Sequence, residues 1–143
     1  ITFNYGLILG WASINNEISL IPIFFYFGAI FWTLGYDTIY GFQDIKDDEI
    51  IGLKSTSIKF KKNPYLFLST CYVNFSLSLL AVGWFMNFDY FYFLLLILIF
   101  TQIFYFQIKK LNTKKPENCL KIFKSNNILG LGIFVTLLIG KIL

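Results

Sequence analysis

The sequence predicts an all-α protein, a multi-span bundle of transmembrane helices with about four full spans and one partial span. Of the 143 residues, 57% are hydrophobic and only 14% are charged. A soluble domain usually carries about 25% charged residues, and one with this composition would expose large apolar patches, which soluble monomers rarely do. The apolar residues also gather into stretches of about 20 residues, the length of one bilayer crossing. We therefore expect the chain to fold in lipid.

Five apolar stretches define the expected helices, taken in chain order. We interpret residues 1–12 as the end of a helix whose beginning lies outside this sequence. Residues 19–40 are long enough for a complete span. Residues 64–85 form the next span, and Pro64 stands in its first turn, where a proline is well tolerated.

The last two stretches complete the expected bundle. Residues 90–108 are an almost unbroken run of Phe, Leu, Ile and Tyr, as suits a helix in lipid. Residues 126–139 are shorter, contain glycine and are followed by Lys141. Since no repeat or linker divides the chain, we expect residues 1–143 to belong to a single transmembrane domain.

The charged residues lie in the connections between these stretches. All twelve basic residues are lysines, and they concentrate in the connections 41–63 and 109–125, whereas the connections 13–18 and 86–89 carry only Glu17 and Asp89. This alternation follows the positive-inside rule. We expect the lysine-rich connections on the cytoplasmic side of a bacterial inner membrane, or the matrix side of a mitochondrial one. Nucleic-acid surfaces place basic residues along a soluble face, so no nucleic-acid partner is expected.

The residue types present restrict the possible chemistry. The chain has no histidine and only two cysteines, Cys71 and Cys119. Imidazole-bound metals, His-based catalysis and a disulfide framework are therefore not expected. Any metal bound by this chain would be a hard cation with oxygen ligands.

Acidic residues cluster in one short segment. Five of the eight acids lie between Asp37 and Glu49. On a continuous helix, the spacings of seven and four residues would place Asp37, Asp44 and Asp48 on one face. Clustered carboxylates near a membrane are costly unless a cation holds them. Mg²⁺ is such a cation, since it binds a few carboxylates completed by water and substrate phosphate. The same pattern also fits a solvated loop of mixed charge between two helices.

The segment from Tyr36 to Thr56 carries a more specific pattern. It reads YDTIYGFQDIKDDEIIGLKST, and it resembles the second aspartate-rich motif of the 4-hydroxybenzoate polyprenyltransferases of the UbiA type, approximately YDTxYxxxDxxDDxxxGxKST. The similarity includes the Tyr-Asp-Thr start and the Gly-x-Lys-Ser-Thr end. The region around Gly10 and Trp11 and the residues 118–130 are also similar to this family, so the resemblance covers essentially the whole chain.

The resemblance implies a fold and an activity. Such enzymes have about nine transmembrane helices around a cavity open to lipid, and this chain would be the C-terminal half of that domain. They transfer a polyprenyl group from polyprenyl diphosphate to the ring of 4-hydroxybenzoate, with Mg²⁺, in ubiquinone biosynthesis. The expected partners are therefore these two substrates, the lipid bilayer and the missing N-terminal half of the same enzyme.

The motif also implies roles for individual residues. By position in the motif, Asp44 and Asp48 would be the metal-binding pair, and Asp47 would be a further ligand near the same site. Asp37 would orient or help deprotonate the phenol of the acceptor, or stand in the outer shell of the site. Lys54 would contact the diphosphate, an assignment that rests on its charge and position.

One departure from the family leaves other interpretations open. The first aspartate-rich motif, of the type Asn-Asp-x-x-Asp, is absent from the sequence, so we do not expect activity from this chain by itself. The alternatives are a sibling enzyme with another acceptor (menaquinone, tocopherol or haem-tail type), a non-catalytic channel or transporter half, and an inactive prenyl-lipid-binding fragment. The flanks of the motif argue against the sibling enzyme, and the gathering of ionisable residues at one mouth argues against the channel.

Overall fold

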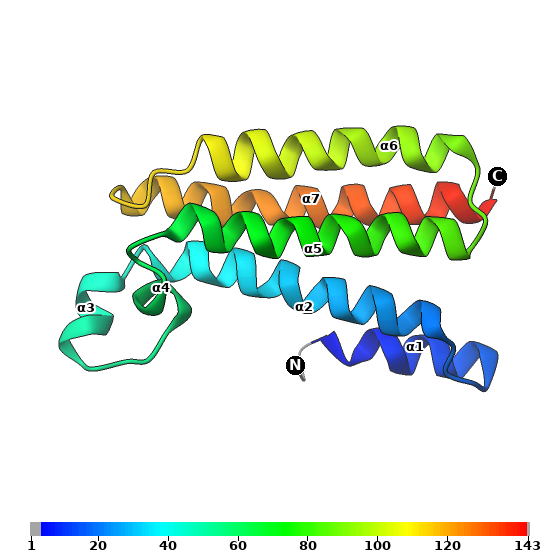
Figure 1. Cartoon of the computed structure of the whole chain (residues 1–143), viewed down its shortest axis with the longest axis horizontal. Coiled ribbons are helices and arrows are strands. Elements are labelled where there is room, and N and C mark those ends of the chain that lie inside the picture. Colours follow the sequence, from blue (N-terminus) through cyan, green and yellow to red (C-terminus); the bar gives the residue numbers. More distant parts are fainter. Residues whose placement is uncertain (1–3, 143) are drawn as a thin grey trace.

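The structure is a computed structural model that describes residues 4–142, and this part consists of helices and connections without a strand (Figure 1). Four helical stretches are long and apolar enough to cross a membrane: Leu20–Gly41, Pro64–Phe85, Tyr90–Lys109 and Pro116–Ile142. A shorter apolar helix, Gly6–Asn15, precedes them. The all-α prediction and the prediction of four full spans with one partial span are both confirmed. In chain order, the elements are α1 (Gly6–Asn15), α2 (Leu20–Gly41), α3 (Ile45–Ile50), α4 (Thr56–Lys59), α5 (Pro64–Phe85), α6 (Tyr90–Thr101), the π-helix η2 (Gln102–Lys109) and α7 (Pro116–Ile142).

The long helices run side by side, and the connections between them gather at the two ends of the bundle. Figure 1 shows α3, α4 and the turn between η2 and α7 at one end, and the α1–α2 turn, the α5–α6 turn and the C-terminus at the other. The lysine-rich connections 41–63 and 109–125 therefore share one end. This arrangement agrees with the alternation of charge in the sequence.

The expected helix limits are correct within one residue for α2 and α5, and they differ more for α1 and α7. The span at residues 64–85 matches α5, and α2 differs from residues 19–40 by one residue at each end. The last helix begins at Pro116, well before residue 126. Its first turns carry Pro116 and Glu117, which favour a helix start, but they are too polar to be detected as part of a span. Of the stretch 1–12, residues 1–3 lie outside the described part, and α1 continues to Asn15.

The core lies between α5 and its neighbours. Tyr92 of α6 donates its phenolic hydrogen to the carbonyl oxygen of Leu79 at 2.8 Å, which joins α6 to α5 inside the bundle. Large buried side chains of this core, each at most 2% exposed, include Ile39, Leu68, Tyr72, Phe75, Leu79, Tyr92, Leu96, Ile103 and Leu129.

Two glycines of α2 set its separation from α5. Small residues on membrane helices let two backbones approach closely. A Cβ at Gly28 would lie 1.7 Å from Oγ and 2.5 Å from Cβ of Ser78, and a Cβ at Gly35 would lie 2.7 Å from the ring of Tyr72. A larger residue fits at these positions only if Ser78 or Tyr72 shifts or the two helices move apart. The position of α2, which leads into the aspartate-rich segment, therefore depends on these two contacts.

Replacing Gly28 with valine tests this packing. In the complete protein, Gly28→Val should lower the free energy of unfolding by about 1–3 kcal/mol, the usual effect of an overfilled interior. The matched control is Gly10→Val on α1, where no atom lies within 4 Å of the added Cβ. Unfolding in detergent, followed by circular dichroism, measures both variants. Equal losses for the two variants would contradict the predicted close contact.

Candidate functional site

The aspartate-rich segment lies at the end of the bundle where α2 stops (Figure 1). Helix α2 ends at Gly41, and Phe42 is buried against the core at 3% exposure. Asp44 then begins α3: its carbonyl oxygen accepts the backbone N–H groups of Asp47 and Asp48, each at 3.0 Å. The assumption of one continuous helix through this segment is therefore wrong, because the chain leaves α2 before Asp44. Asp37 does not share a helical face with Asp44 and Asp48.

A close contact with α4 accompanies the end of α2. A Cβ at Gly41 would lie 2.6 Å from Oγ of Ser57, so the segment that returns toward α5 touches the last turn of α2. Ser57 is 1% exposed, although it lies in a polar connection. The sequence carries no signal for this contact, since it joins residues on opposite sides of the acidic cluster.

Two of the predicted site residues, Asp44 and Asp47, line one pocket. Its volume is 520 Å³, and its other lining residues are Phe42, Gln43, Ile45, Lys46, Thr113, Lys114 and Pro116. The connection between η2 and α7 thus brings Lys114 to the pocket of the aspartates. This lysine was not a candidate in the sequence, because the alternation of charge places the two connections on the same side of the membrane without indicating which of their residues meet.

The other predicted site residues lie outside this pocket. Lys54 is exposed and lines a separate depression with Ser55, Thr56 and Lys59. Asp48 is half-buried on the first turn of α3 and Asp37 is exposed near the end of α2. Within residues 4–142, no three acidic, histidine or cysteine residues are placed together as a metal site. The roles assigned to these residues therefore remain predictions.

The donor set nevertheless suits a hard cation. Asp44 and Asp47 line the same pocket, Asp48 follows directly on α3, and the side chains of all three offer only carboxylate oxygens. Mg²⁺ is commonly held by one or two carboxylates, with water and substrate phosphate completing its octahedron. These residues fit Mg²⁺ as a partner of a bound phosphate group, and they do not form an all-protein cage. Glu49 is engaged elsewhere, in an ion pair with Lys61.

The tyrosines of the segment pack against α7. The ring centroid of Phe123 lies 5.9 Å from that of Tyr36 and 4.8 Å from that of Tyr40. Aromatic pairs at these separations attract each other beyond the area they bury. The contacts hold the last two turns of α2 beside α7.

A polar cluster connects three helices in the interior. Trp32 of α2 donates its indole hydrogen to Oδ1 of Asn126 on α7 at 3.0 Å, and Gln107 of η2 donates from Nε2 to the same oxygen at 3.0 Å. Gln107 is 0% exposed and lies in the π-helix η2. Such wide helical turns are rare and are frequently found at functional sites. Side-chain hydrogen bonds of this kind join helices where lipid surrounds the bundle.

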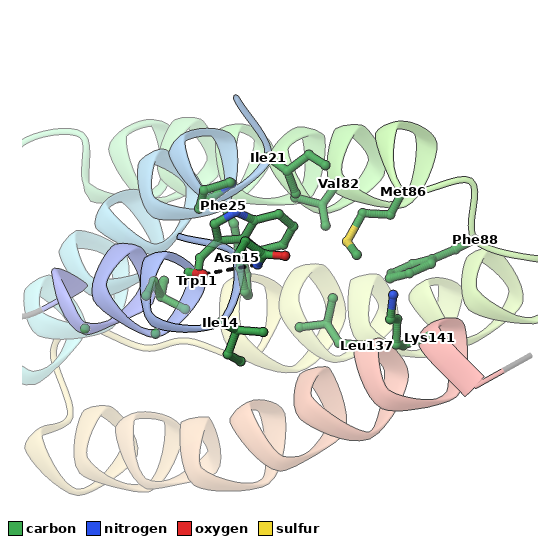
Figure 2. A pocket seen from close by; sticks show the side chains of 14 residues that line it. Trp11, Ile14, Asn15, Ile21, Phe25, Val82, Met86, Phe88, Leu137 and Lys141 are labelled. Atoms are coloured by element: carbon green, nitrogen blue, oxygen red, sulfur yellow. Dashed lines mark hydrogen bonds between the residues drawn. The ribbon is translucent and has the colours of Figure 1, made fainter. Parts of the chain in front are cut away.

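A second pocket, of 490 Å³, lies at the opposite end of the bundle, between α1, α2, α5 and α7 (Figure 2). Figure 2 shows Trp11, Phe25, Met86 and Leu137 around it, with Lys141 at one side. Its lining residues include no acid and are almost all apolar. This pocket suits an apolar chain and has no groups to bind a divalent cation.

Comparisons with known proteins agree with the motif. The model of the UbiA prenyltransferase family matches residues 1–134. The chain is 37% identical over 145 residues to the 4-hydroxybenzoate polyprenyltransferase, mitochondrial, of Bos taurus, across 99% of this chain and 38% of that protein. The same figures hold for the Homo sapiens protein of that name. The 4-hydroxybenzoate octaprenyltransferase of Francisella tularensis is 31% identical over 145 residues, across 100% of this chain and 49% of that protein. The chain thus spans about half or less of the length of these relatives. No solved structure matches the chain.

The polar cluster of Trp32, Gln107 and Asn126 yields a stability prediction. Asn126→Leu in the complete protein should lower the free energy of unfolding by about 1–3 kcal/mol, because it leaves the buried amide of Gln107 and the half-buried indole N–H of Trp32 without their acceptor. The matched control is Asn74→Leu, since among residues 4–142 Asn74 donates only to the carbonyl oxygen of Thr70 in its own helix, at 2.8 Å. Unfolding in detergent compares the two, and a larger loss for Asn74→Leu would contradict the prediction.

Proposed function

The chain belongs to the UbiA prenyltransferase family, and we propose that it is the C-terminal part of a membrane enzyme that transfers a polyprenyl group to 4-hydroxybenzoate. The donor is a polyprenyl diphosphate, and the product is a prenylated 4-hydroxybenzoate of ubiquinone biosynthesis. The observation that carries this proposal is the match of 99–100% of the chain to relatives that bear this activity in their names. Because the chain covers only 38–49% of those relatives, the activity belongs to the complete protein.

We assign the diphosphate group to the end of the bundle that carries α3. Asp44 and Asp48 would hold a divalent cation, Mg²⁺, and Asp47 would be a further ligand. The bound cation would neutralise charge on the diphosphate as it leaves. Lys54 would add a positive charge for the phosphate oxygens, where a flexible ammonium suits a point contact.

Asp37 has a different place in the proposed site. It is exposed on α2, on the helical face that also carries Phe27 and Leu34, which are 51% and 36% exposed. A carboxylate is costly within a membrane span unless it faces a protein interior or a water-filled cavity. We therefore assign this face to the substrate cavity of the complete enzyme, where Asp37 would accept a hydrogen bond from the acceptor phenol and orient its ring.

The reaction joins the two substrates with a balanced exchange of bonds. The allylic C–O bond of the donor breaks and diphosphate leaves with the electron pair. The ring carbon beside the phenolic oxygen forms the new C–C bond and then loses its proton. Groups that favour charge on the leaving oxygens lower the barrier of the first step, which is the role proposed for Lys54. The lysine-rich connections would place this end on the cytoplasmic or matrix side.

Substitution of the aspartates tests the metal assignment. In the complete protein, Asp44→Asn and Asp48→Asn should each lower turnover by about 100-fold or more, as expected when a group that stabilises the leaving charge is lost. The assay uses membranes with 4-hydroxybenzoate, geranyl diphosphate and Mg²⁺, and the folded fraction of each variant is measured beside it.

The matched control is Asp89→Asn at the opposite end of the bundle. Asp89 is exposed and its carboxylate accepts the N–H of Tyr90 at 2.6 Å, where it begins α6. This variant should keep near-normal turnover. Near-normal turnover of both Asp44→Asn and Asp48→Asn would contradict the assignment of these aspartates to the metal.

A further inference from the structure

Two threonine hydroxyls join the ends of the aspartate-rich segment. Thr38 follows Asp37 on α2 and is 1% exposed. Its Oγ1 lies 2.6 Å from Oγ1 of Thr56, the first residue of α4, at a sequence separation of 18. The part of the sequence between Thr38 and Thr56 contains the end of α2, the whole of α3 and Lys54.

The proton count fixes the direction of this hydrogen bond. Oγ1 of Thr38 also lies 2.6 Å from the carbonyl oxygen of Leu34, to which only the hydroxyl can donate. A threonine hydroxyl has one proton, so Thr38 must accept the other bond and Thr56 must donate it. The result is a directed chain of bonds from α4 to the backbone of α2. The hydroxyl proton of Thr38 is therefore donated within the protein, to the carbonyl oxygen of Leu34.

The residues around Thr56 leave little room for movement. Ser57 lies against Gly41, where a Cβ would be 2.6 Å from its Oγ. Ser55 shares a hydrogen bond of 2.8 Å with Ser57 through their hydroxyls, and its Oγ accepts the N–H of Ile58 at 3.4 Å. These contacts hold residues 55–57 against the last turn of α2.

Each end of the link is close in sequence to a residue assigned to a substrate. Asp37 directly precedes Thr38, and Lys54 comes two residues before Thr56. We infer that Thr38 and Thr56 are positioning residues for the prenyl diphosphate. Their hydrogen bond joins the two ends of the segment that carries the aspartates, and it sets the position of Lys54 relative to α2. This inference rests on the proposed function. The two residues would act through the segment they hold and would not touch the substrate themselves.

Valine replaces threonine with nearly the same shape and removes the hydroxyl. In the complete protein, Thr38→Val and Thr56→Val should each raise the KM for geranyl diphosphate by about 10-fold, the effect of losing one hydrogen bond at this site. The KM for 4-hydroxybenzoate should not change. Because both variants remove the same link, the double variant should show no larger effect than either single one. Thr38→Ser and Thr56→Ser should restore the KM.

The matched control is Thr136→Val on α7. Thr136 is 3% exposed and donates to the carbonyl oxygen of Gly132 at 2.8 Å, the same local bond that Thr38 makes to Leu34. It has no second side-chain partner among the described residues. Its valine variant should keep both KM values. If Thr38→Val does not fold, Thr56→Val carries the test, since Thr56 is only half-buried.

A binding measurement separates failure of this inference from failure of the proposed function. Calorimetry with inorganic diphosphate and Mg²⁺ needs no acceptor, and wild type should bind about 10-fold more tightly than Thr56→Val. Lack of product with 4-hydroxybenzoate would refute the proposed acceptor and leave this binding difference to be observed. The positioning role is overturned by equal diphosphate affinity in the two proteins, by no binding to wild type, or by lower thermal stability with both KM values unchanged.

Discussion

The bilayer is the constraint on which the rest of this structure depends. Backbone N–H and C=O groups find no water in the hydrocarbon core, so each span must satisfy them within a helix. Charged side chains are costly at that depth, and the twelve lysines therefore lie near the ends of the spans or between them. The aspartate-rich segment is subject to the same rule. Its chain leaves α2 at Gly41, at the end of a span, and forms the short helix α3 outside the apolar part.

Hydropathy was sufficient to predict the spans but not the places where helices break. Residues 64–85 were predicted correctly because a proline starts that span and polar residues flank it. The start of α7 was missed because its first turns are polar, although they are helical. The end of α2 at Gly41 accompanies the burial of Phe42 and the contact with Ser57. Such contacts depend on how distant segments meet, and a pattern of residue types does not record them.

The motif predicted which segment carries the chemistry, while the structure added its surroundings. Asp44 and Asp47 share a pocket with Lys114, a residue from a connection that the motif does not include. Thr38 and Thr56 belong to the motif, but the motif does not indicate that their hydroxyl oxygens lie 2.6 Å apart. Trp32 and Gln107 both donate to Oδ1 of Asn126, which joins three helices. In each case the sequence separation is too large for periodicity to reveal the contact.

The central claim is that the end of the bundle carrying α3 is one wall of a site where a divalent cation binds the prenyl diphosphate. The most direct test is product formation by the complete protein in membranes, with 4-hydroxybenzoate and geranyl diphosphate, before and after removal of divalent cations by a chelator. The account predicts prenylated product with Mg²⁺, its loss with the chelator, and its return when Mg²⁺ is added back. Product formation that continues without divalent cations would contradict it.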